Sequence, residues 1–191
     1  MSEKLGVLSG PGVEIRAPRI YTIEMRQDDP AKCTSAKMRR MGLARPMSIR
    51  SIPKGALVLN PAAEDTLSKA DRQSALSFGI VVIDCSWAKA QDLFARLQFR
   101  GHQRRLPALL AGNPTNYSKI GALSSLEAVA ASLYILGFSN VAKKLLSIYK
   151  WGGTFLTLNQ EPLDEYSRAE SAQQVTKIER SYFPNSQEEH L

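Results

Sequence analysis

The chain has few of the residues that build disulfide frameworks or zinc sites. Its 191 residues include two cysteines and two histidines, which support neither a cysteine-stapled scaffold nor a Cys/His metal site. The longest apolar run, 128–138, is interrupted by Ser132 and is shorter than the roughly 18 residues of a membrane span. Residues 1–19 lack the apolar stretch of a signal peptide. We therefore expect a cytoplasmic protein that binds no metal.

Common nucleotide-binding and hydrolase motifs are also missing. The sequence contains neither G-x-G-x-x-G nor a Walker A pattern, so a Rossmann dinucleotide site and a nucleotide triphosphatase are unsupported. His102 lies in a basic stretch without a nucleophile elbow, which argues against Ser/His/Asp hydrolysis. Asp28-Asp29 precedes a proline, a pattern more typical of an Asx-turn than of a metal site.

The sequence has an uneven excess of positive charge. Hydrophobic residues make up 43% and charged residues 23% of the chain, as in globular proteins with a core. The formal net charge is +7, with +6 over residues 26–54, +4 over 89–105 and −4 over 155–191. This asymmetry favours a basic face that binds RNA, because neutralising phosphates releases counterions. A solvated basic face is the alternative.

Hydrophobic patterning predicts an α/β half with a parallel sheet, followed by a mostly helical half. Continuous apolar runs are typical of strands buried on both faces. The predicted strands lie at 19–25, within 48–59, at 80–83 and at 106–111, and the helices between them at 65–77 and 87–99. Further helices are predicted at 126–136, at 141–149 and within 163–180. We expect a flexible leader at 1–18, an N-terminal α/β domain at 19–105 and a C-terminal helical domain at 106–191.

Polar clusters follow three of these predicted strands. Asn60-Pro61 follows the second strand, Asp84-Cys85-Ser86-Trp87 the third, and AGNP at 111–114 the fourth. Ligands bind open parallel sheets at the carboxyl ends of the strands. The clusters therefore predict a binding site at this edge of the sheet.

Six motifs, in order along residues 19–160, carry a resemblance to a known family. They are DDPAKCT at 28–34, LNP at 59–61, DCSW at 84–87, RLP at 105–107 with LLAGNP at 109–114 and NY at 116–117, LSS at 123–125 with EA at 127–128, and WG at 151–152 with Phe155 and Asn159. Together they resemble the ribosome-biogenesis aminocarboxypropyltransferases, which modify small-subunit ribosomal RNA in eukaryotes and archaea. Asn60 and Ser118 depart from the family pattern, in which Ser and Gly are expected.

The resemblance implies a SPOUT-like fold with a deep trefoil knot in the C-terminal half, which periodicity alone would not suggest. It implies transfer of the 3-amino-3-carboxypropyl group of S-adenosylmethionine to N3 of a uridine or pseudouridine in small-subunit rRNA, with release of 5′-methylthioadenosine. The implied partner is small-subunit rRNA or the pre-ribosomal small subunit. A monomer is expected.

Transfer of this group, rather than the methyl group, sets a geometric demand on the cofactor pocket. The base must approach the carbon of the amino-acid arm in line with the sulfur, at about 3–3.5 Å, so the methyl group must be buried. Trp87 and Ala90 are the expected wall, and an indole face also suits a sulfonium. By resemblance, the cofactor-binding residues are Thr34, Leu59, Pro61, Ile83, Trp87, Ala90, Leu106, Gly121, Leu123, Ser124, Ser125 and Ala128.

Asp84 is the candidate catalytic residue. Its carboxylate would orient the substrate, attract the sulfonium or help to remove the proton of the base. Purely structural roles also fit: Asp84 or Ser86 could cap a helix beginning near Trp87, and Trp87 could be a core aromatic. We expect Cys85 to pack against its neighbours rather than to act as a nucleophile.

Helix capping is also an alternative role for other predicted cofactor residues. Thr34 could cap a helix at 37–41. Ser124 and Ser125, with Glu127, form a capping arrangement for the helix that begins near residue 126.

We expect basic residues to contact rRNA phosphates, which strengthens binding without specifying a base. Tyr117 could stack on a flipped base, although packing in the core is the commoner role of a tyrosine. Two other functions stay open, a SPOUT-type S-adenosylmethionine-dependent RNA methyltransferase and a non-catalytic ribosome-assembly factor. The expected phosphate-binding residues are Lys37, Arg39, Arg40, Arg45, Arg104 and Arg105.

Overall fold

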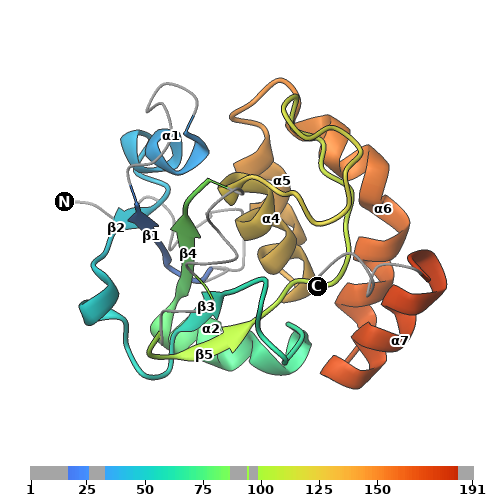
Figure 1. Ribbon diagram of the computed structural model, residues 1–191, viewed down its shortest axis with the longest axis horizontal. Helices are drawn as coiled ribbons and strands as arrows, with labels where there is room; N and C mark the ends of the chain where they lie inside the picture. The colour runs from blue at the N-terminus through green and yellow to red at the C-terminus, as the bar shows by residue number, and fades with distance from the viewer. Residues whose placement is uncertain (1–16, 26–32, 87–93, 95–98, 185–191) are drawn as a thin grey trace, which may run out of the picture.

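The computed structural model describes residues 17–25, 33–86, 94 and 99–184 of the chain (Figure 1). Strands and short helices come first, and only helices follow after residue 124. The elements are β1 (Ile20–Glu24), α1 (Thr34–Arg40), β2 (Arg45–Pro46), the 3-10 helix η1 (Ile49–Ser51), β3 (Leu57–Leu59), the 3-10 helix η2 (Lys69–Asp71), α2 (Arg72–Phe78), β4 (Ile80–Asp84), β5 (His102–Arg104), α4 (Ser125–Ile135), α5 (Ser139–Leu146), α6 (Gly152–Arg168) and α7 (Ala172–Tyr182).

The five described strands form one parallel sheet in the order β2-β1-β4-β3-β5. The central strand β4 is covered on both faces. Ile80 and Val82 pack into one apolar cluster, whereas Val81 and Ile83 pack into another. The predicted parallel sheet is confirmed. The run at 80–83 is continuously apolar because its strand is buried on both faces, as predicted.

The larger apolar cluster lies between the sheet and the C-terminal helices. α4 contacts β4, α5 and α6, and nine of its eleven residues are buried. Figure 1 shows α6 and α7 on the side of the molecule away from α1. The predicted helices at 126–136 and 141–149 correspond to α4 and α5. The charged stretch at 163–180 contains the end of α6 and most of α7, whose N-cap is Ser171.

Some strand predictions were wrong in position. Residues 106–111 do not form a strand, and the fourth strand of the sequence prediction is replaced by β5, a polar segment at His102–Arg104. Within 48–59, only Leu57–Leu59 is a strand, because Ile49–Ser51 forms a 3-10 turn. The two-residue strand β2 was not expected.

Some predicted features are not tested by the described residues. The helix expected at 87–99 is described only at Phe94 and Phe99, and most of the expected leader at 1–18 lies outside the described residues. The domain boundary near residue 105 stays a prediction, and the larger apolar cluster includes Leu57 and Leu133 from either side of it. Within the described ranges, no helix is long and apolar enough to cross a membrane.

Side chains of α6 and α7 explain why the apolar run at 106–111 is not a strand. Asn159 accepts a hydrogen bond from the Leu110 N–H (2.7 Å) and donates one to the Leu110 carbonyl (2.8 Å). Glu179 accepts from the Ala108 N–H (2.7 Å), and the Tyr166 hydroxyl donates to the Ala108 carbonyl (3.2 Å). The run also makes backbone hydrogen bonds to residues 118–121, including those from the Ala111 N–H to the Lys119 carbonyl and from the Gly121 N–H to the Leu109 carbonyl. Its partners are therefore helix side chains and a loop, and not a strand of the sheet.

Replacing Asn159 with leucine should destabilise the protein. Asn159 is fully buried, and Asn159→Leu would leave the N–H and the C=O of Leu110 without that partner. We expect the free energy of unfolding to fall by about 2–4 kcal/mol, as measured by urea denaturation. Thr157→Ala, at an exposed position of the same helix, is the control and should change stability by about 0.5 kcal/mol or less. Equal effects of the two substitutions would contradict this role of Asn159.

Candidate active site

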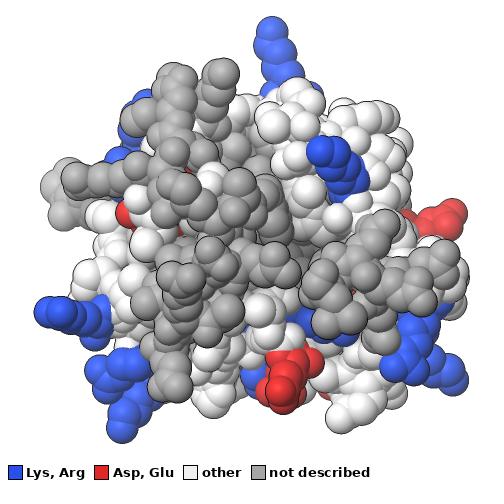
Figure 2. Space-filling model, in the orientation of Figure 1, with Lys and Arg blue, Asp and Glu red and all other residues white. Residues whose placement is uncertain are grey.

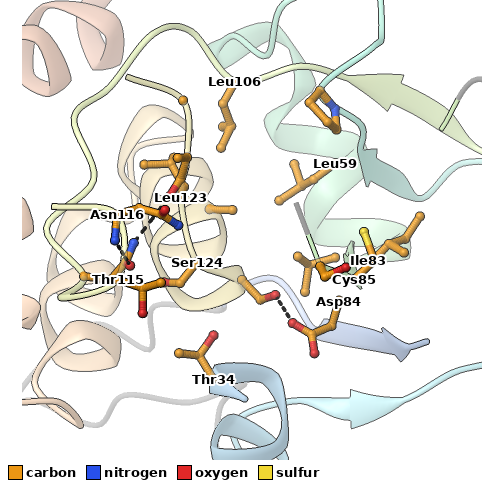
Figure 3. Close-up of a pocket in the computed structure, with 18 of the residues that line it drawn as sticks. Thr34, Leu59, Ile83, Asp84, Cys85, Leu106, Thr115, Asn116, Leu123 and Ser124 are labelled. Atoms are coloured by element: carbon orange, nitrogen blue, oxygen red, sulfur yellow. Dashed lines mark hydrogen bonds between the residues drawn. The ribbon is translucent and has the colours of Figure 1, made fainter. Parts of the chain in front are cut away.

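A cavity of about 720 Å³ lies at the carboxyl ends of β3, β4 and β5. The sheet register brings these ends together, since Leu59 of β3 is opposite both Val82 of β4 and Arg104 of β5. The start of α1, parts of the segment 105–123 and the start of α4 complete the wall. In Figure 3, side chains from these separate segments point into a common space. The cavity lies at the edge of the sheet where the polar clusters predicted a site.

Every predicted cofactor residue that the structure describes lines this cavity. Trp87 and Ala90 lie outside the described residues, so their expected role as the methyl wall stays a prediction. The candidate catalytic residue Asp84 also lines the cavity. The predicted cofactor residues found in its wall are Thr34, Leu59, Pro61, Ile83, Leu106, Gly121, Leu123, Ser124, Ser125 and Ala128.

The wall combines an apolar surface with a few polar groups. Leu59, Ile83, Leu106 and Leu123 contribute aliphatic side chains from four different segments, and Ala128 occupies little volume. A largely apolar wall with a small number of polar groups is typical of pockets for small organic ligands. Across the described part of the chain, no three His, Cys, Asp or Glu side chains form a cluster that could hold a metal ion.

The Asp84 carboxylate is fixed where β4, α1 and α4 meet. One oxygen accepts a hydrogen bond from the Cys33 thiol (Sγ–Oδ2 2.9 Å), and the other accepts one from the Ser125 hydroxyl. Figure 3 shows the carboxylate at the same end of the cavity as Thr34. A fixed carboxylate beside an apolar wall attracts a cationic group of a ligand, because the surroundings screen its charge less than water does.

Cys33, and not Thr34, caps α1. Its sulfur accepts a hydrogen bond from the Ala36 N–H (3.3 Å). The Thr34 hydroxyl instead accepts one from the Leu126 N–H (3.2 Å) in the first turn of α4. The predicted capping role of Thr34 was therefore wrong, and the residue joins the starts of two helices at the cavity wall.

The Cys33 thiol is held in its protonated form. Burial raises its pKa, and the hydrogen bond to Asp84 raises the pKa further, because an anionic sulfur would lose that bond and repel the carboxylate. The thiol therefore serves as a hydrogen-bond donor that positions Asp84.

Glu127 joins two segments of the cavity wall. Its buried carboxylate accepts hydrogen bonds from the N–H groups of Gly112 (2.7 Å) and Asn113 (2.9 Å) and from the Asn113 side-chain amide (2.7 Å). It also accepts from the N–H and the hydroxyl of Ser124, both at 2.7 Å. Ser124 and Glu127 form a capping box at the start of α4, so this predicted capping arrangement is confirmed. The same carboxylate fastens the segment at 112–113 to α4.

Two of the predicted phosphate-binding arginines have partners within the protein. Arg105 forms a bidentate ion pair with the buried Glu179 (3.0 and 2.9 Å). Arg104 pairs with Asp71 (3.0 Å) and with the exposed Asp65 (3.1 Å). Both arginines line the cavity, and their ion pairs hold β5 and the following segment against α7 and η2. The sequence could not show these partners, because the acidic residues lie far away in the chain.

The other predicted phosphate-binding residues lie on α1 and β2. Arg39 forms an ion pair with Glu24 (3.2 Å), and Lys37 donates a hydrogen bond to the Ile148 carbonyl (2.8 Å). Arg40 and Arg45 are exposed. In the view of Figure 2, the visible Lys and Arg side chains are spread around the rim of the molecule and outnumber the acidic ones.

Several residues of the cavity wall were missed as site residues. Tyr149 and Trp151 line the cavity, although they follow a helix rather than a strand, and Trp151 was noted only as part of the motif WG at 151–152. Asn113, whose side chain accepts from the Asn116 N–H (3.0 Å), was noted only as part of a motif. Tyr117 does not line the cavity and is 59% exposed, so the expectation that it packs in the core was wrong.

The two departures from the family pattern have local structural explanations. The Asn60 side chain accepts from the Ala62 N–H (2.8 Å) and donates to the Gln103 side chain (2.6 Å), which links the ends of β3 and β5. Ser118 has a φ of +62°, in the left-handed region that favours glycine.

Replacing Asp84 with asparagine should make the Cys33 thiol more reactive. Asp84 raises the pKa of this thiol, so Asp84→Asn should lower that pKa and increase the fraction of the reactive thiolate. We expect Cys33 to be alkylated by iodoacetamide severalfold faster near pH 8, as followed by mass spectrometry of separate Cys33 and Cys85 peptides. Glu161→Gln, which removes an exposed carboxylate of α6, should leave the rate unchanged. A rate that does not rise in Asp84→Asn would contradict the hydrogen bond.

Comparison with known proteins identifies the family. The family model described as ribosome biogenesis protein, C-terminal, matches residues 57–183. The 16S rRNA aminocarboxypropyltransferases of Thermoplasma volcanium and Thermoplasma acidophilum are 49% and 50% identical to this chain, each over 86% of it and 98% of the relative. The structure of the SAM-dependent rRNA:acp-transferase Tsr3 from Vulcanisaeta distributa matches with a TM-score of 0.83 and 38% identity, over 91% of this chain and 94% of that one. The chain therefore belongs to the family of ribosome biogenesis proteins that includes the 16S rRNA aminocarboxypropyltransferases.

Proposed function

We propose that this protein is an S-adenosylmethionine-dependent transferase that attaches an aminocarboxypropyl group to small-subunit rRNA during ribosome biogenesis. The observation that carries the proposal is the 49–50% identity, over 86% of the chain, to relatives named as 16S rRNA aminocarboxypropyltransferases. The cavity supports it, because each described residue expected to contact the cofactor lies in its wall.

We propose the following chemistry for the transfer. The target is N3 of a uridine or pseudouridine. The new bond joins N3 to the carbon of the amino-acid arm next to sulfur. The bond between that carbon and sulfur breaks, and its electron pair stays on sulfur, which leaves as part of 5′-methylthioadenosine. The N3 proton passes to water, which makes a protein base useful but not obligatory.

The residues of the wall fit S-adenosylmethionine. Leu59, Leu106 and Leu123 offer apolar contacts for its adenine ring, and the fixed Asp84 carboxylate lies where a cationic sulfonium or ammonium group would be stabilised. Both oxygens of Asp84 already accept a hydrogen bond. We therefore assign Asp84 the role of holding the positive charge of the cofactor rather than that of the general base.

We propose that Trp87 and Ala90 enclose the methyl group and leave the amino-acid arm facing the RNA. This placement would select arm transfer over methyl transfer, because only the arm carbon could then meet the base in line with sulfur. A SPOUT-type methyltransferase would need the opposite orientation.

The finer features of fold and assembly are also proposals. We propose a deep trefoil knot in the C-terminal half, which the resemblance to the family implies. We propose a monomer that acts in the cytoplasm. The described large hydrophobic side chains that are exposed are the scattered Met41, Phe78 and Tyr117, which supports a monomer.

We propose that rRNA phosphates approach the side of the cavity formed by α1 and β2. α1 carries three basic residues in its last turn, and its first residue lines the cavity. Of the six predicted phosphate contacts, Arg39, Arg40 and Arg45 are the stronger candidates, because their side chains are exposed, whereas those of Arg104 and Arg105 are 20% and 19% exposed and are bound to acidic partners.

Labelled cofactor tests the reaction. We expect carboxyl-labelled S-adenosylmethionine, and not methyl-labelled S-adenosylmethionine, to label small-subunit rRNA when incubated with the enzyme. Large-subunit rRNA in a parallel incubation is the substrate control and should stay unlabelled. Incorporation of the methyl label alone would identify a methyltransferase. Absence of either label, together with rRNA binding, would favour the non-catalytic assembly factor.

The proposed phosphate contacts can be tested by the salt dependence of rRNA affinity. In a plot of log affinity against log salt, Arg40→Gln with Arg45→Gln should reduce the slope by about one for each lost contact. The matched control is Lys177→Gln with Arg180→Gln, which removes the same charge from the exposed surface of α7, on the far side of Figure 1 from α1. Equal slopes for the two double variants would place the RNA elsewhere.

A further inference from the structure

An aromatic pair in the cavity wall has no role in the cofactor contacts proposed above. The rings of Tyr149 and Trp151 lie 4.9 Å apart between centroids, with an interplanar angle of 31°. Both side chains are partly exposed and line the cavity. Two adjacent aromatic rings that remain partly exposed in a cavity wall offer a surface for another planar ring.

The pair is held rigidly by its surroundings. It belongs to residues 147–151, which connect α5 to α6. Lys37 donates to the Ile148 carbonyl and lies 3.8 Å from the centroid of the Tyr149 ring. A Cβ on Gly152 would approach the Leu146 carbonyl oxygen to 2.0 Å, so only glycine permits this close turn into α6. These contacts anchor the connector on both sides of the aromatic pair.

The pair lies at the reactive end of the cavity. Burial raises the pKa of Tyr149. The phenol therefore stays neutral. Arg40 also interacts with Tyr149 and partly offsets this rise in the pKa. The rings thus lie beside α1, whose Lys37 covers Tyr149 and whose N-cap Cys33 bonds to Asp84.

We propose that Trp151, supported by Tyr149 and Lys37, is the surface on which the target base of the rRNA stacks during the transfer. This inference rests on the proposed function, since it assigns a binding site to the substrate of that reaction. A base must leave its own stack before its ring nitrogen can reach the cofactor. An aromatic face replaces the lost stacking, and the cations of α1 lie beside it for the flanking phosphates.

The assignment differs from the one suggested by the sequence. Tyr117 was the candidate for stacking, but it is exposed outside the cavity. Lys37 was expected to bind phosphate, but its ammonium group lies over the Tyr149 ring. One face of Tyr149 is therefore covered by a cation, which leaves Trp151 as the ring available to a base.

Tryptophan fluorescence tests this inference independently of catalysis. The chain has two tryptophans, so Trp87→Phe leaves Trp151 as the only emitter and Trp151→Phe leaves Trp87. We expect hexauridylate to quench the emission of Trp87→Phe, whereas an abasic phosphodiester of the same length should not. The emission of Trp151→Phe should not respond to either oligomer. Equal responses to both oligomers, or no response to hexauridylate, would overturn the proposal.

Kinetics distinguish the RNA site from the cofactor site. Trp151→Leu, which keeps an apolar side chain, should raise the KM for small-subunit rRNA by about 10–100-fold and change the affinity for S-adenosylmethionine, measured by calorimetry, less than about twofold. Trp151→Phe should recover most of the loss because it restores an aromatic face. Tyr117→Leu is the matched control and should leave the KM unchanged.

The outcomes separate the two proposals. If the wild-type enzyme transfers no carboxyl label, the proposed function fails, and the fluorescence experiment still decides whether Trp151 binds a base. If Trp151→Leu weakens cofactor binding as much as rRNA binding, the ring belongs to the cofactor site and the inference is wrong. A raised KM in Tyr117→Leu, with Trp151→Leu unaffected, would return the stacking role to Tyr117.

Discussion

The shape of the site depends on one buried carboxylate. Glu127 is fully buried, and a charge without partners would be costly there. Five donors compensate it, three from Gly112 and Asn113 and two from Ser124. Through these bonds, residues 112–113, in one wall of the cavity, are attached to the start of α4, which forms another part of the wall. Loss of this carboxylate would detach this segment from the start of α4.

Polar side chains of the helices also bind backbone groups along residues 105–113. Beyond residue 105 this segment pairs with none of the five strands of the sheet, and its backbone bonds to residues 118–121 and to side chains of the helices. Asn159 bonds to the N–H and the C=O of Leu110, and Glu179 bonds to the Ala108 N–H and the Arg105 guanidinium. Together with the backbone bonds to residues 118–121, these side chains satisfy polar groups that a neighbouring strand would otherwise bind, so an irregular segment can be buried. The cavity can be lined by this segment because its other side is occupied by α6 and α7.

These arrangements explain which parts of the structure could be predicted from the sequence. The apolar run of β4 and the amphiphilic or buried helices follow directly from local patterns, and the capping box at Ser124 has a local sequence signature. By contrast, β5 is polar and short, so no apolar run identifies it, and hydrophobic patterning predicts a strand at 106–111 in its place. Burial against helices and burial within a sheet produce the same local pattern.

The site was predictable where strands end, and less so elsewhere. Asp84 follows a recognisable strand, and its position at the sheet edge follows from the topology of parallel strands. Tyr149 and Trp151 enter the cavity from a connector between helices, and although WG at 151–152 belongs to the family motifs, no strand end places that connector at the wall. The acidic partners of Arg104 and Arg105 could not be predicted from the sequence either, since Glu179 lies 74 residues away from Arg105. A local count of charges identifies a basic segment but not which of its cations remain available.

Opposite charges at the site serve different parts of the proposed reaction. The cofactor is cationic at sulfur and the RNA is a polyanion, so a uniformly basic cavity would repel the first and a uniformly acidic cavity the second. Inside the cavity, the cations of Arg104 and Arg105 are paired with Asp71 and Glu179. Asp84 lies inside the cavity with its charge held by Cys33 and Ser125, whereas Arg40 and Arg45 are exposed outside it. Because water and salt screen exposed charges within about 10 Å, the outer cations can attract phosphates without cancelling the field of the enclosed carboxylate.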